Sequence, residues 1–134
     1  MEVTIVERAL VAIGLLAVIS LIPFAGRVVG ARGRRKAQTA AHGLDLDLTR
    51  PTVLYFWTPT CQQCRAVQAP TLARLAHETP AHIVAVDATA DLALADRFGV
   101  MTVPTTIVLS PQGDVRAVNH GLASLAQLKS QLHT

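Results

Sequence analysis

The N-terminal part of the chain is an apolar block followed by a basic block. Residues 9–26 contain no charged side chain and are nearly all apolar. As an α-helix rising about 1.5 Å per residue, this block is about 27 Å long, close to the roughly 30 Å hydrocarbon core of a bilayer. A helix that is apolar on all sides suits a membrane span or a buried core helix, and a domain this small has little room to enclose one. We therefore expect one transmembrane helix within residues 1–30.

A cleaved signal peptide is the main alternative for this block. Signal peptides begin with basic residues and have a shorter apolar stretch. Here Glu2 and Glu7 precede the block, and most of the basic residues follow it: Arg27, Arg32, Arg34, Arg35 and Lys36. Because positive residues beside a span favour the cytoplasmic side, we expect the following domain in the cytoplasm, with the extracytoplasmic side as the alternative.

Residues 31–49 read as a basic linker that leads into a folded domain. Residues 30–43 are rich in Arg, Gly and Ala and have few apolar anchors. Residues 44–48 alternate apolar and acidic side chains, which favours a short edge strand. Pro51 then ends this segment, and the domain is expected to occupy residues 50–134.

Four short runs in the domain have the composition of β-strands. The run at residues 52–57 is a continuous series of β-branched, aromatic and aliphatic residues, which is typical of a buried strand. Three further runs are expected to be strands, at residues 82–87, 105–109 and 115–119. A turn at residues 111–114 joins the last two.

Helical spacing of apolar residues separates these strands. It predicts helices from Cys61 to about residue 77, over residues 91–98, and from Gly121 to the end of the chain. Pro70 is expected to kink the first helix. The second helix has Asp91 or Thr89 as its cap and Gly99 as its end.

The order of these elements predicts the architecture. Two parallel strand–helix–strand crossovers are followed by a hairpin and a last helix. This order gives an α/β domain with a mixed central sheet and helices on both faces. No internal repeat is present.

Charge is distributed unevenly along the chain. The formal net charge is +3, but residues 37–134 contain six Lys or Arg against seven Asp or Glu, which leaves that part near −1. The basic character therefore belongs to the segment beside the apolar block. Such a pairing favours contact with lipid headgroups, and no nucleic acid partner is expected.

The chain has two cysteines, Cys61 and Cys64, spaced as C-x-x-C directly after a predicted strand. A first cysteine at a helix start faces unpaired N–H groups and the positive end of the helix, which favours its thiolate. Cys61 is then the nucleophile and Cys64 the resolving thiol. A structural disulfide or half of a zinc site are the alternatives. The five histidines are scattered, whereas zinc needs four ligands, so we expect no metal and no cofactor.

Two stretches resemble the signatures of the thioredoxin family. Residues 53–65, which read VLYFWTPTCQQCR, resemble its active-site strand and helix start, and residues 98–105, which read FGVMTVPT, resemble its second signature. The resemblance covers roughly residues 50–132 and implies a thioredoxin-like fold. It also implies a cis peptide bond before Pro104, which faces the cysteines. Further residues are expected to support the site or bind substrate: Trp57, Arg65, Val103 and Thr105.

The chain departs from the family pattern at several positions. Tyr55 stands where the family usually has a buried carboxylate, and the residues between the cysteines are Gln62 and Gln63. Thr60 precedes Cys61 in place of a tryptophan. Pro70 lies one residue later than the usual helix proline.

Together these features predict a membrane-tethered thiol–disulfide oxidoreductase that reduces or exchanges protein disulfides. Its expected partners are protein disulfide or dithiol clients, an upstream thiol reductase, and membrane lipid around the N-terminal helix. One alternative is a non-catalytic thioredoxin-fold interaction module. Another is a dedicated thiol reductant for the maturation of metal or haem proteins.

Overall fold

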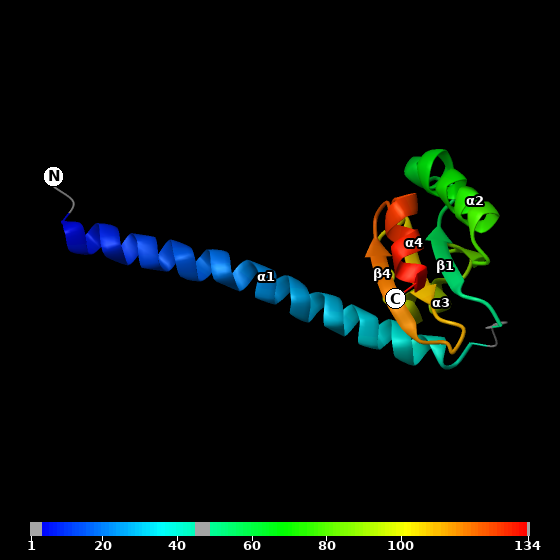
Figure 1. The fold of residues 1–134 in the computed structure, drawn as a ribbon, viewed down its shortest axis with the longest axis horizontal. Coiled ribbons are helices and arrows are strands. Elements are labelled where there is room, and N and C mark those ends of the chain that lie inside the picture. The colour runs from blue at the N-terminus through cyan, green and yellow to red at the C-terminus, as the bar shows by residue number, and fades with distance from the viewer. Residues whose placement is uncertain (1–3, 45–48, 134) are drawn as a thin grey trace. The chain divides into compact units, whose positions relative to one another are not determined.

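The computed structural model describes residues 4–44 and 49–133 (Figure 1). Packing divides the chain into two compact units, residues 1–32 and residues 33–134. The edge strand expected at residues 44–48 falls almost entirely outside the described residues. Each unit is described by itself below.

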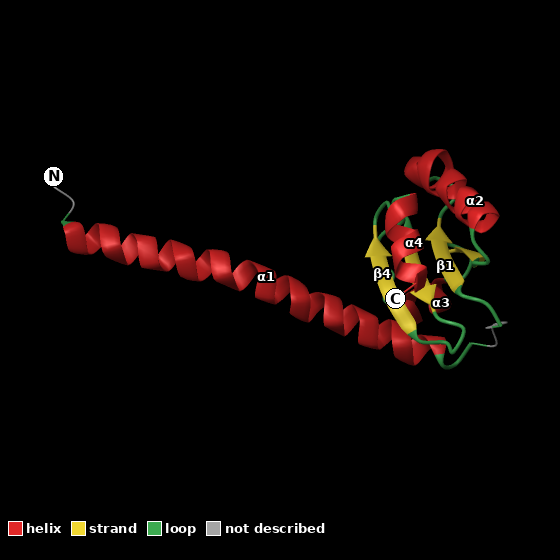
Figure 2. Cartoon of the chain, viewed as in Figure 1, coloured by secondary structure: helices red, strands yellow, loops and turns green. Residues whose placement is uncertain are grey.

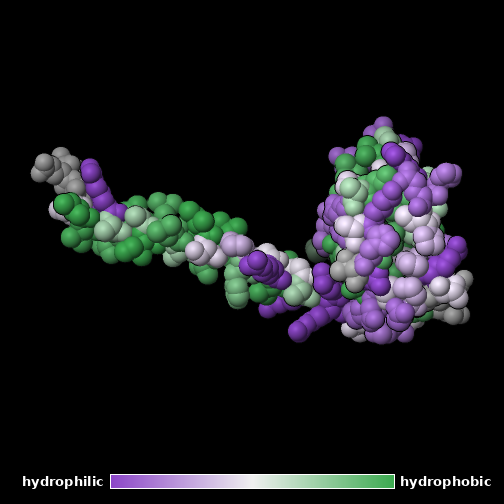
Figure 3. Space-filling view, viewed as in Figure 1, coloured by the Kyte–Doolittle hydropathy of each residue, from purple (hydrophilic) through white to green (hydrophobic). Residues whose placement is uncertain are grey.

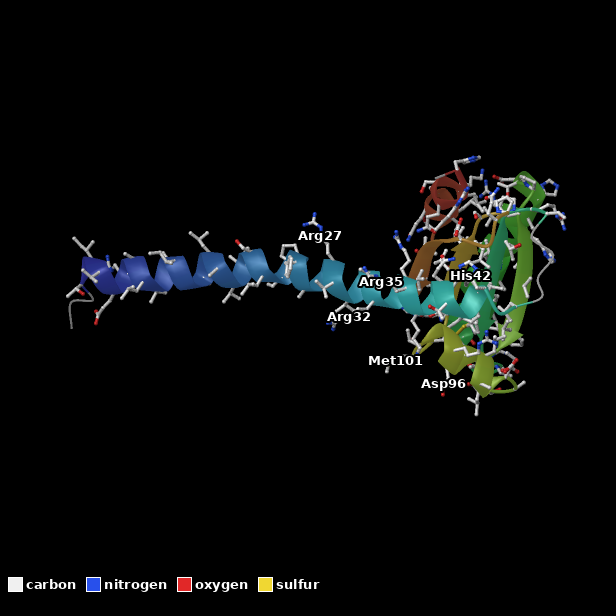
Figure 4. The ribbon with its side chains drawn as sticks, turned by 90° about the horizontal axis from the view of Figure 1, so that it is seen from below. Arg27, Arg32, Arg35, His42, Asp96 and Met101 are labelled. Atoms are coloured by element: carbon white, nitrogen blue, oxygen red, sulfur yellow. A yellow bond between two sulfur atoms is a disulfide. The ribbon has the colours of Figure 1, made fainter. Side chains whose placement is uncertain are left out.

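The first unit consists mainly of one helix. Helix α1 runs from Ile5 to Ala41, and its residues in the first unit are apolar and exposed over most of their length (Figure 3). This helix is long and apolar enough to cross a membrane. The side chains of Arg27, Arg32 and Arg35 extend from α1 beyond the apolar block (Figure 4).

The helix continues through residues 31–41, where we expected a linker. The Ala, Arg, Lys and Gln residues of this segment are good helix formers, and a single glycine costs a helix only about 1 kcal/mol relative to alanine. Burial supplies the rest, because Ala37, Ala40 and Ala41 are at most 4% exposed. These alanines recur at helical spacing and face the core of the second unit. The boundaries of anchor, linker and domain stay predictions, but the end of α1 packs as part of the second unit.

The second unit contains a four-stranded sheet with strand order β2-β1-β3-β4 (Figure 2). β1 pairs in parallel with β2, and the other two pairings are antiparallel. The mixed sheet expected from the element order is therefore confirmed. The expectation of two parallel crossovers is wrong for the second one, because the connection through α3 returns the chain on the other side of β1, where β3 runs antiparallel to β1. The strands are β1 Thr52–Trp57, β2 His82–Asp87, β3 Thr105–Leu109 and β4 Val115–His120.

The helix expected after Cys61 is divided in two. A π-helical turn, η1, spans Cys64–Gln68, and α2 follows at Ala69–Glu78. Pro70 lies in the first turn of α2, directly after η1, and Gln68 and Ala69 keep helical backbone angles where the two segments join. The kink expected at Pro70 stays a prediction.

The two remaining helices lie near their predicted positions. α3 spans Leu92–Phe98; the Asp91 carboxylate accepts a hydrogen bond from the Leu94 N–H at 2.9 Å, which confirms Asp91 as its cap. Gly99 ends α3 with a φ of +69°, as a left-handed C-cap requires. α4 spans Leu125–His133 and thus begins four residues after Gly121.

Helices cover both faces of the sheet, as predicted. On one face, Leu72 and Leu75 of α2 and Leu128 of α4 pack with Val53 and Val108. On the other face lie α3 and the last turns of α1, which pack against alternate residues of the same strands: Leu54, Phe56, Ile107 and Leu109. Alternation of side chains along each strand produces the two layers.

Candidate active site

The cysteine pair lies just beyond the carboxyl end of β1. Residues 58–60 form a turn in which the Cys61 N–H donates to the Thr58 carbonyl at 3.1 Å. Cys61 and Cys64 form a disulfide with an S–S distance of 2.11 Å and a Cα–Cα distance of 5.3 Å. Cys64 is fully buried and Cys61 is partly exposed. A partner disulfide therefore has access to Cys61 and not to Cys64.

The backbone after Cys61 presents a hydrogen-bond donor to its sulfur. The Cys64 N–H donates to Cys61 Sγ at 3.1 Å. This N–H belongs to the start of the helical segment, where backbone donors lack helical acceptors. In the dithiol form the same donor favours a thiolate on Cys61, which agrees with the predicted nucleophile.

The residues expected to support the site have different surroundings. Trp57 and Val103 pack against the core cluster that contains Cys64. The Val103–Pro104 peptide is cis, as the resemblance implied. The Thr105 side chain is fully buried and donates to the Thr102 carbonyl at 2.7 Å, so it holds the loop before β3.

Two exposed side chains lie close in sequence to the cysteine pair or to the cis peptide. The Arg65 guanidinium donates to Gln62 Oε1 at 3.5 Å. Its expected role in supporting the site stays a prediction. Met101, three residues before Pro104, is 96% exposed and extends from its loop (Figure 4). It adds apolar surface to the segment that leads into the cis peptide.

Tyr55 occupies the position of the family's buried carboxylate and makes a different contact. Its side chain is 5% exposed, and its hydroxyl donates to the Cys64 carbonyl at 2.9 Å. Burial raises the pKa of Tyr55 above its ordinary value, so the phenol stays protonated at neutral pH. Tyr55 thus fixes the backbone of the resolving cysteine and is not a base.

The π-helical turn explains the displaced proline. The Ala69 N–H donates to the Cys64 carbonyl, five residues back, whereas an α-helix would use a carbonyl four residues back. The turn therefore accommodates one extra residue between Cys64 and Pro70. Pro70's late position was the sequence signal for this turn.

Gln68 is a residue that sequence reasoning missed. Its side chain is fully buried in η1 and forms hydrogen bonds with the backbone of Ala123, in the loop before α4. The two residues lie far apart in the chain, and no local pattern links them. Among residues 4–44 and 49–133, no three His, Cys, Asp or Glu side chains gather as a candidate metal site.

Comparison with known proteins agrees with this geometry. The family model described as Thioredoxin matches residues 37–134. Among solved structures, a mutant thioredoxin from Halobacterium salinarum NRC-1 is similar with 25% identity and a TM-score of 0.59, covering 65% of this chain and 75% of that chain. The thioredoxin of Fasciola hepatica is similar with 26% identity and a TM-score of 0.55, covering 63% of this chain and 80% of that chain.

The match of the family model begins at Ala37, the first buried residue of α1, so it includes the helix end that packs on the sheet. A thioredoxin fold that holds two cysteines within disulfide distance is suited to thiol–disulfide exchange. The fold, the cysteine pair and the family match agree: the chain belongs to the thioredoxin family.

Proposed function

We propose that this protein reduces or exchanges disulfides of protein clients at a membrane surface. The observation that carries the proposal is the asymmetry of the cysteine pair. Cys61 is partly exposed and its sulfur accepts a hydrogen bond from the Cys64 N–H, whereas Cys64 is buried behind it. An accessible nucleophile with a protected resolving thiol is what two-step exchange requires.

The reaction begins from the dithiol. The Cys61 thiolate attacks one sulfur of the client disulfide, and the other client sulfur leaves as a thiolate that takes up a proton. Cys64 loses its proton to water and attacks Cys61 Sγ, which releases the second client thiol. The client gains two electrons, and the protein ends with the Cys61–Cys64 disulfide that the structure contains.

Turnover then needs a dithiol donor to reduce that disulfide. By the same chemistry, this donor is an upstream thiol reductase. The reduction potential of the couple decides the direction: about −270 mV would favour reduction of clients, and about −120 mV would favour their oxidation. Which clients the protein serves, including metal or haem proteins under maturation, depends on the surface around Cys61.

The apolar part of α1 supports the membrane part of the proposal. Residues 9–26 would lie in the bilayer, and the basic residues from Arg27 to Lys36 would meet lipid headgroups on the cytoplasmic side. A membrane-impermeant thiol reagent applied to intact cells should then leave the reduced cysteines unlabelled. Strong labelling would show that the domain lies on the extracytoplasmic side. A mature chain that lacks residues 1–25 would show that no membrane anchor remains.

Insulin reduction tests the proposed activity. The full-length protein in detergent micelles, supplied with dithiothreitol, should accelerate the precipitation of insulin B chains. The variant Cys61→Ser should lose this activity and serves as the matched control. If parent and variant give the same rate, the proposed catalysis is wrong, and a non-catalytic interaction module is the better description.

A further inference from the structure

Gln68 carries a polar side chain into the most protected part of the site. The side chain is fully buried, four residues beyond Cys64. Its Nε2 donates to the Ala123 carbonyl at 3.2 Å, and its Oε1 accepts from the Ala123 N–H at 2.8 Å. Both main-chain polar groups of Ala123 are therefore paired with one side chain.

The loop that contains Ala123 is also tied to the cis-proline segment. The Gly121 N–H donates to the Pro104 carbonyl at 2.8 Å. Ala123 is 3% exposed and belongs to the core cluster that includes Cys64. Between the two tethered residues, Leu122 is 46% exposed. The loop is thus held at Gly121 and at Ala123, and the apolar side chain of Leu122 between them is exposed.

The side-chain amide of Gln68 matches the hydrogen-bonding groups of the Ala123 backbone. A glutamine offers one donor and one acceptor at the same end of its side chain, which matches the N–H and C=O of a single residue. An apolar replacement would leave both groups of Ala123 buried without partners, and the loop would move toward water to satisfy them. The π-helical turn places Gln68 at this point, because the bond from the Ala69 N–H to the Cys64 carbonyl adds one residue to the turn.

We propose that Gln68 is a positioning residue that fixes the loop of residues 121–124 against the cysteine-bearing helix, so that the loop presents Leu122 to protein clients. This inference rests on the proposed function. The hydrogen bonds of the Gln68 side chain are with the backbone of Ala123. Loss of Gln68 should therefore weaken reaction with large clients and leave the intrinsic reactivity of Cys61 unchanged.

The test compares a protein disulfide with a small one. Full-length Gln68→Leu in detergent is assayed for reduction of insulin and of cystamine, both with dithiothreitol as donor. We expect the insulin rate to fall by about fivefold or more, the effect of roughly one lost hydrogen bond, and the cystamine rate to stay within about twofold. Alkylation of reduced Cys61 by iodoacetamide should also be unchanged.

Gln131→Leu is the matched control. The Gln131 amide pairs with the Asn119 side chain at 2.8 and 2.9 Å, so this variant also breaks two hydrogen bonds, between α4 and β4. A purely structural effect would lower the insulin rate in both variants to the same degree. We expect Gln131→Leu to keep both rates within about twofold, because the loop tether is intact.

Several outcomes would overturn the inference. One is an unchanged insulin rate in Gln68→Leu, a second is an equal fall in the insulin and cystamine rates, and a third is an equal fall in the control. If Gln68→Leu does not fold, Gln68→Glu keeps the acceptor for the Ala123 N–H and is judged by the same criteria. A parent protein without insulin activity would refute the proposed function itself, which separates the two failures.

Discussion

Gln38 joins the end of α1 to the edge of the sheet, and its replacement should show how much this contact contributes to the stability of the domain. Its Oε1 accepts from the Val115 N–H at 2.5 Å, and its Nε2 donates to the Gly113 carbonyl at 3.3 Å. β4 is an edge strand, and the Val115 residue is 7% exposed. The side chain of α1 therefore supplies the partner that a further strand would otherwise provide.

The magnitude follows from what Gln38→Ala leaves behind. The Val115 N–H stays buried without its acceptor, which costs about 1–3 kcal/mol, and the longer contact to Gly113 adds little. For a domain of this size, 1 kcal/mol lowers the melting temperature by roughly 4–8 °C. A loss of about 2 kcal/mol thus predicts a decrease of about 8–16 °C.

Thermal unfolding of the full-length protein in detergent provides the assay. Trp57 is the single tryptophan and packs against the core cluster beside the disulfide, so its fluorescence reports on the domain and not on the apolar helix. Thr39→Ala is the control, because the exposed Thr39 hydroxyl bonds only to the Arg35 carbonyl within α1. Equal melting temperatures for the two variants would refute the view that the end of α1 stabilises the domain through Gln38.

Three further predictions concern the dithiol and the acid stability. In the reduced protein, Cys61 should react with iodoacetamide well before Cys64, and Cys64→Ser should trap mixed disulfides with clients; equal reactivity would contradict the role of the helix start. Tyr55→Asp should speed insulin reduction at pH 7, because it places a buried proton acceptor near Cys64, and it should lower the free energy of unfolding by roughly 3 kcal/mol. A folded Tyr55→Asp variant that is no faster than Tyr55→Phe would show that proton transfer at this position does not limit the reaction. The hydrogen bonds from Lys129 and then Arg74 lower the pKa of Glu78 from 4.5 to about 2. The stabilisation from the ionised Glu78 is complete above pH 4.5 and is lost as the pH falls toward 2. The melting temperature of Glu78→Gln should therefore depend less on pH in that window than the melting temperature of the parent. Parallel curves for parent and variant would contradict this role of Glu78.

The positions of the four strands were predictable from sequence because each strand carries a strong local signal. The strand order and the antiparallel direction of β3 were not predicted, because strand pairing depends on contacts between distant segments. The run at residues 52–57 is β-branched and aromatic, and a buried strand of that composition has few alternatives. Asp91 and Gly99 marked the ends of α3 for equally local reasons. The cis peptide before Pro104 followed from the family resemblance rather than from any local pattern.

The parts that escaped prediction depend on distant partners. Ala37, Ala40 and Ala41 had helical spacing, but alanine is too weakly apolar to distinguish a core helix from a linker without the sheet that covers it. Gln68 is polar, and no local sequence pattern marks it as buried. Its partner lies 55 positions away, and only the folded chain brings them together.

The π-helical turn at Cys64–Gln68 also has a consequence for how this chain tolerates changes in length. The turn confines one additional residue to a single widened ring, and Pro70 still falls in the first turn of the helix that follows. Removing one residue from this ring would restore α-helical spacing and leave α2 in phase with the sheet beneath it. A change in length here is therefore confined to the turn that begins at Cys64, next to the disulfide, while the rest of the domain keeps its register.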